Sequence, residues 1–140
     1  RAYGNALGGI LGSHSGGAEN EFDIFVDAVT QNSAEALAAL TPIERSYADI
    51  LDDVRALATP SDFAQQHVDL LNALSLIQTD IVAMQQTFSD PLGALMRAKR
   101  YHRDALGLFH ALDHTRSAFE KSGIAYVSDE PGIFLFSLRP

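Results

Sequence analysis

The sequence predicts an all-α protein: an antiparallel, up-and-down bundle of three or four helices with a C-terminal β-hairpin. The first observation is an apolar stripe between Ser61 and Phe88, in which eight residues follow one another at alternating spacings of four and three. This spacing is typical of a helix that packs lengthwise against other helices. The stripe predicts a rod of roughly 40 Å. Its members are Phe63, His67, Leu70, Leu74, Ile77, Ile81, Met84 and Phe88.

The second observation is a set of three helix-start signals. Thr41-Pro42, Thr59-Pro60 and Asp90-Pro91 each place a capping residue before a proline, which suits the first position of a helix. A proline also ends the preceding helix, so the connections must be short and the neighbouring helices antiparallel. The last helix is expected to run from about residue 92 to 121 and to end at Gly123, a glycine in the left-handed cap position.

Residues 19–40 also have a helical apolar pattern, with a weak point at Thr30 to Ser33. Asn32 and Glu35 have the spacing of a capping box, although asparagine replaces the usual serine or threonine. The segment is therefore expected to form either one helix or two short ones. Together with the three helices above it makes the predicted bundle domain, residues 19–123.

Residues 1–18 form a glycine-rich arm that holds six of the ten glycines. On a helix, glycines four residues apart would form a ridge of bare backbone that another helix can approach closely. Three alternatives remain open: a flexible leader, an arm that orders against another subunit, or the end of a removed membrane anchor. The residues expected to make assembly contacts are Gly4, Gly8, Gly12, Gly16, Leu7, Ile10 and Leu11.

The third observation is a change of pattern in residues 124–140. Two β-prone apolar stretches, 124–127 and 133–138, flank a turn signal at Pro131-Gly132. An isolated hairpin is marginally stable in water, so this one must pack on the bundle or on a neighbouring subunit. Phe134 and Phe136 are its expected contact residues.

Composition excludes several classes of chemistry. The chain has 140 residues and no cysteine, so it is expected to be one domain without disulfides, thiolate catalysis or cysteine metal sites. Its formal net charge of −8 disfavours nucleic acid as a partner. Residues 91–140 are an exception, with seven Lys and Arg against five Asp and Glu. Arg97, Arg100 and Arg103 there form either a solvated helix face or a patch that docks the acidic half of another copy.

One polar residue interrupts the central stripe. If the last two helices run antiparallel through the turn at Asp90, His67 lies level with Asp113. We expect these two residues to form a buried hydrogen-bonded pair. A metal site at this level is a weaker alternative, because His110 and His114 point away from the apolar face. A haem held by two histidines is also weaker, because His67 and His102 lie at different heights.

No catalytic, phosphate-binding or dinucleotide motif is present, and no stretch is long enough to span a membrane. The two unusual ends suggest a non-enzymatic structural subunit that assembles head to tail in a filament or other cell-surface assembly. The alternative is a monomeric helical binding module of the cell envelope, with one dominant surface groove. Both place the protein outside the cytoplasm, and neither needs a cofactor.

Overall fold

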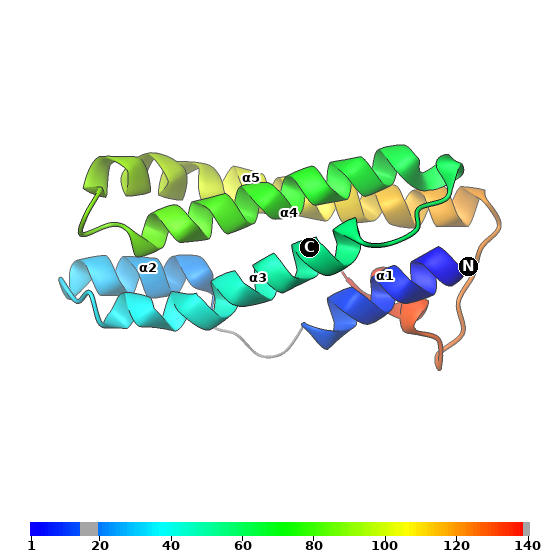
Figure 1. Cartoon of the computed structure of the whole chain (residues 1–140), viewed down its shortest axis with the longest axis horizontal. Helices are drawn as coiled ribbons and strands as arrows, with labels where there is room; N and C mark the ends of the chain where they lie inside the picture. The colour runs from blue at the N-terminus through cyan, green and yellow to red at the C-terminus, as the bar shows by residue number, and fades with distance from the viewer. Residues whose placement is uncertain (15–19, 139–140) are drawn as a thin grey trace.

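The computed structural model describes residues 1–14 and 20–138, and these residues form helices and no strand (Figure 1). The all-α prediction is therefore confirmed. The elements in chain order are α1 (Ala2–Ser13), α2 (Glu21–Thr30), the 3₁₀ turn η1 (Ala36–Ala39), α3 (Leu40–Arg55), η2 (Ser61–Phe63), α4 (Ala64–Gln85), α5 (Pro91–Lys121), η3 (Pro131–Ile133) and α6 (Phe134–Ser137).

The long helices α4 and α5 run antiparallel along the molecule, and α3 packs lengthwise against α4 (Figure 1). The predicted stripe on α4 and the turn before it faces the core of the bundle: seven of its eight side chains, from Phe63 to Met84, are buried. The prediction was wrong for Phe88, whose side chain is 45% exposed. Helix α4 ends at Gln85, so Phe88 lies in the turn before α5 and no longer follows the helical period.

The predicted helix boundaries are right where the capping chemistry is strongest. Asp90 accepts a hydrogen bond from the Gly93 amide at 3.0 Å and begins α5. At the other end, Gly123 has a φ of +67°, and the Ile124 amide donates to the Phe119 carbonyl at 3.0 Å. This is the left-handed glycine cap expected from the sequence.

Neither of the other two start signals supplies a side-chain cap: after Thr59-Pro60, the 3₁₀ turn η2 begins at Ser61 with Pro60 before it. Helix α3 begins one residue before Thr41 and continues directly from η1, so Thr41 does not cap it. Within residues 20–39 the chain forms two helical pieces, α2 and η1, because Asn32 between them takes a left-handed conformation with a φ of +49°. Ser33, rather than Asn32, supplies the cap: its hydroxyl accepts from the Ala36 amide at 3.1 Å.

The glycine-rich N-terminus is helix α1, which packs against α3, η3 and α6 of its own chain. Two glycines allow this close approach. A Cβ at Gly4 would lie 1.8 Å from the hydroxyl of Tyr126, and one at Gly8 would lie 2.3 Å from the Pro131 carbonyl. The glycine ridge therefore exists, but it meets the C-terminal segment of the same chain. Gly16 lies outside the described residues.

The predicted C-terminal hairpin is wrong. Pro131 and Gly132 begin a 3₁₀ turn, and a single α-helical turn follows. A hairpin would need two strands that pair with each other, whereas here the segment bonds to α1: the Gly132 amide donates to the Asn5 side chain at 3.0 Å. Arg1 also pairs with Glu130, and this hydrogen-bonded pair lowers the Glu130 pKa to about 2.

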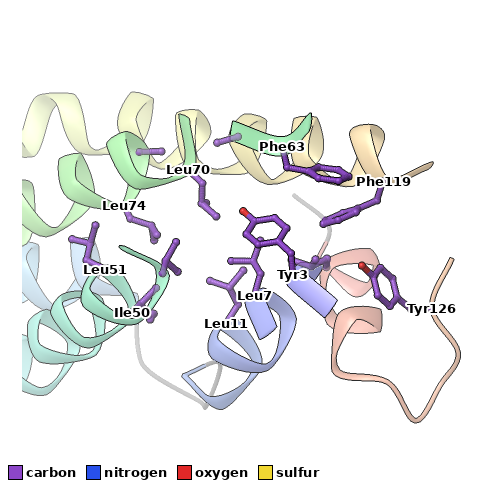
Figure 2. Packing of buried hydrophobic residues seen from close by; sticks show 14 residues of the cluster. Tyr3, Leu7, Leu11, Ile50, Leu51, Phe63, Leu70, Leu74, Phe119 and Tyr126 are labelled. Carbon is purple, nitrogen blue, oxygen red and sulfur yellow. The ribbon is translucent and has the colours of Figure 1, made fainter. Parts of the chain in front are cut away.

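The core has an aromatic end and an aliphatic middle. The Tyr3 ring of α1 packs beside those of Phe63 and Phe119, with centroids 5.9 and 6.1 Å away, and Phe119 meets Tyr126 edge to face (Figure 2). Leu7 and Leu11 continue this packing along α1 (Figure 2). Helix α2 covers the opposite end of the bundle, where a second apolar cluster lies. The fourth side of the bundle is thus shared between α1 at one end and α2 at the other.

Candidate functional site

The predicted pair of His67 and Asp113 does not form. Nδ1 of His67 lies 3.0 Å from the hydroxyl of Tyr3, and burial lowers the pKa of the imidazole. Asp113 is exposed and pairs with Arg116 on its own helix. Sequence spacing placed the two residues at one height. In the structure α1 fills the space over His67, whereas Asp113 lies outside the core-facing side of α5.

The predicted basic patch is partly used within the chain. Arg97 lies 3.4 Å from the buried Asp80, and Arg103 lies 2.7 Å from its neighbour Asp104, also buried. Burial, followed by the charge of Asp104, raises the Asp80 pKa to about 6, whereas Arg97 acts in the opposite direction. Arg100 is exposed. Within residues 1–14 and 20–138, no group of three His, Asp or Glu side chains could hold a metal ion.

The residues expected to make assembly contacts mostly contact other residues of the same chain. Leu7 and Leu11 are buried, and Ile10 packs beside them in the core. Gly12 lies in contact with the ring of Phe134, where an added Cβ would be 3.5 Å away. Phe136 packs on Tyr126, with ring centroids 5.8 Å apart. These side chains stabilise the fold of one chain.

The structure instead presents a cleft of about 480 Å³ where α1 ends and α2 begins. Its size falls in the range of small-molecule sites. Side chains of α4 and α5 line it together with those of α1, α2 and α3, so the cleft reaches from the surface to α4 and α5. The lining residues are Leu11, His14, Glu21, Ile24, Ala39, Pro42, Ile43, Ser46, Tyr47, Ile50, Leu74, Leu108, Leu112, Phe134 and Leu138.

A few polar groups stand among these apolar walls. On one side, Nδ1 of His14 lies 3.0 Å from the hydroxyl oxygen of Ser46. On another, Glu21 accepts a hydrogen bond from the hydroxyl of Tyr101 at 2.7 Å. Burial, followed by the charge of Glu21, raises the pKa of Tyr47. Burial and the hydrogen bond to Glu21 likewise raise the pKa of Tyr101, so both phenols stay protonated as donors.

This arrangement is suited to binding. A serine nucleophile would need a histidine oriented by a third group and donors for the oxyanion. In the described part of the chain, no carboxylate bonds to His14. The apolar walls with a few fixed donors and acceptors instead match the general pattern of a ligand pocket.

Sequence reasoning missed this cleft because its parts come from segments assigned other roles. His14 belongs to the glycine-rich arm, and Glu21 belongs to the segment that was interpreted only as helix. One signal was available: Leu11 and His14, the residue directly after α1, are three residues apart, which is the spacing of one helix face. Only the fold shows that this face meets Ser46 and Tyr47 of α3.

Comparison of the chain with protein-family models, with curated proteins and with solved structures gave no match. Among the described residues, no helix combines the length and apolar character needed to cross a bilayer.

Proposed function

We propose that this protein is a non-enzymatic helical binding module whose cleft between α1 and α2 takes a small amphipathic molecule. The observation that carries the proposal is the cleft itself, with apolar walls and polar groups confined to a few positions. Leu74 and Ile50 at its walls are buried in the core, so an apolar ligand would continue the packing of the bundle. Ser46, His14 and Glu21 would contact its polar end.

Self-assembly through free chain ends, the other function suggested by the sequence, has less support. Helix α1 and the C-terminal segment pack on each other, and in addition α1 packs on α3 and α6 on α5. The Leu7 side chain is fully buried, and Leu135 nearly so. An assembly that used these surfaces would have to release them first, at the cost of the apolar burial they provide.

The binding proposal can be tested with 1-octanol as the probe, followed by NMR chemical-shift changes and by calorimetry. We expect saturable binding, with the largest shifts at Ile43, Ser46 and Leu108. In Ser46→Phe the added ring occupies the cleft, so the affinity should fall at least tenfold. The matched control is Ser75→Phe, a change at an exposed position of α4, which should bind octanol as the wild type does.

Equal affinities in the wild type and in a folded Ser46→Phe variant would contradict the proposal. Shifts confined to the turn between α4 and α5 would contradict it as well, because exposed apolar side chains lie there outside the cleft. A thermal melt of each variant confirms that the comparison is made on folded protein.

A further inference from the structure

We infer that the polar end of the ligand is a cation, an amine or similar group carried on an apolar body, and that Glu21 binds it. The inference rests on the proposed function, since it concerns the same cleft. Glu21 is the first residue of α2 and is half-buried at the wall of the cleft. It is the only carboxylate among the described lining residues.

The charge of Glu21 has no cationic partner within the described residues. The salt bridges there involve other carboxylates: Glu130, Asp52, Asp80, Asp104, Asp113 and Glu120. Glu21 receives hydrogen bonds from tyrosine instead, through Tyr101 at 2.7 Å. A hydroxyl donor orients the carboxylate but leaves its negative charge in place.

The carboxylate also has room for a further donor. An ionised carboxylate has about four acceptor positions on its two oxygens. The hydrogen bond from Tyr101 uses the Oε2 atom, and the carboxylate also interacts with the Tyr47 hydroxyl. An ammonium group offers three N–H donors and a full positive charge, and charge-assisted bonds of this kind are roughly twice as strong as neutral ones.

A tyrosine ring beside the carboxylate favours the same ligand. Tyr47 lines the cleft directly. The Tyr101 ring is buried and is stacked on Phe22, with centroids 5.9 Å apart and an angle of 13° between the planes, which fixes the hydroxyl that bonds to Glu21. The face of a tyrosine ring attracts cations. Carboxylate and tyrosine together are therefore a better match for an ammonium than for a neutral or anionic head.

The overall charge acts in the same direction. The chain carries a formal net charge of −8, and residues 1–90, which include Glu21, hold thirteen Asp and Glu against three Lys and Arg. Such a surface raises the local concentration of cations and repels anions. A carboxylate ligand would have to place its charge near Glu21 at a net cost.

Three probes of one chain length separate the possibilities: octylammonium, 1-octanol and octanoate. They share the apolar body and differ in the charge of the head. We expect wild-type protein to bind octylammonium at least fivefold more tightly than octanol, and octanoate most weakly. Added salt should weaken the binding of octylammonium and leave that of octanol nearly unchanged, because salt screens the ionic contribution.

The variant that tests the assignment is Glu21→Gln, and its matched control is Asp23→Asn, which removes the same charge from an exposed position in the same turn. Glu21→Gln should abolish the preference for octylammonium over octanol, and Asp23→Asn should keep it. If Glu21→Gln does not fold, the salt series on wild-type protein still tests whether the preference for octylammonium is ionic.

The results distinguish the two claims. Equal binding of octylammonium and octanol by wild-type protein, tighter binding of octanoate, or a preference that survives Glu21→Gln would overturn the cation inference. The cleft would in those cases still be a binding site. Failure of all three probes to bind would overturn the proposed function, and the inference with it.

Discussion

The hydroxyl of Tyr3 lies 3.0 Å from Nδ1 of His67, a residue 64 positions further along the chain. This contact joins the first turn of α1 to the first turn of α4. It satisfies a histidine that would otherwise be a buried polar group in an apolar stripe. It also places the Tyr3 ring against Phe63 and Phe119, so the N-terminal helix completes the aromatic end of the core (Figure 2).

Replacement of Tyr3 by Phe should reduce the free energy of unfolding by about 1–3 kcal/mol, because His67 is then buried without its partner. Urea denaturation measures this change. In a His67→Leu background the same replacement should reduce the free energy of unfolding by less than about 0.5 kcal/mol, since it leaves no polar group unpaired. Equal costs in the two backgrounds would show that the hydrogen bond contributes nothing.

Gly8→Ala should destabilise the protein, because the new Cβ would lie 2.3 Å from the backbone carbonyl of Pro131 and α1 would have to shift. We expect a loss of about 1–3 kcal/mol, as for overpacked cores. Gly107→Ala is the matched control: it lies within α5 with nothing inside 4 Å of the new Cβ. That change should stabilise the protein by up to about 1 kcal/mol through helix propensity. Similar effects at both positions would contradict the packing of α1 on η3.

The sequence predicted those parts of the fold that depend on local chemistry and on a long periodic pattern. The stripe from Phe63 to Met84, the Asp90 cap and the Gly123 cap are examples. The two chain ends could not be predicted in this way, because each is ordered by the other. For example, no pattern in the sequence indicates that the Gly132 amide will donate to the Asn5 side chain.

Asp90→Ala should cost about 0.5–2 kcal/mol of stability, because it removes the side chain that accepts from the Gly93 amide at the start of α5. Thr41→Ala is a useful control, since Thr41 precedes a proline in the same way but does not cap α3. Its replacement should change stability by less than 0.5 kcal/mol or so. Denaturation of both variants under one set of conditions makes the comparison, and a larger loss for Thr41→Ala would contradict the observed start of α3.

The buried pair Asp80 and Asp104 predicts a pH dependence. The Asp80 pKa is raised to about 6 in the folded protein, above its value in the unfolded chain. The folded state therefore binds more protons between about pH 4 and pH 6, and Asp80 contributes stability at low pH that is lost as the pH rises through this range. Asp80→Asn removes this contribution.

The measurement is the difference in unfolding free energy between wild type and Asp80→Asn at several pH values. From pH 4 to pH 7 the unfolding free energy of the wild type should fall by roughly 1–3 kcal/mol relative to that of Asp80→Asn, since one pKa unit corresponds to about 1.4 kcal/mol. A difference that is constant with pH would contradict the shift. Arg97→Gln should enlarge the effect, because Arg97 favours the charged form of Asp80.

The candidate site was less predictable than the fold. Its apolar walls follow the helical pattern, as Ile43, Tyr47 and Ile50 are spaced four and three residues apart and so share one face of α3. Its polar groups do not, because the contact of His14 with Ser46 and that of Glu21 with Tyr101 join residues 32 and 80 positions apart. Such pairs can be inferred only once the order of the helices around the bundle is known.

Intermolecular NOEs between octylammonium and the protein give the most direct test of the cleft as a binding site. We expect the terminal methyl group of the probe to contact Ile50, Leu74 and Leu112, and the methylene next to the nitrogen to contact the side chain of Glu21. NOEs to Phe88, Leu92 and Met96 in their place would show that the probe adheres to the exposed apolar residues around the α4–α5 turn, and would contradict a binding function for the cleft.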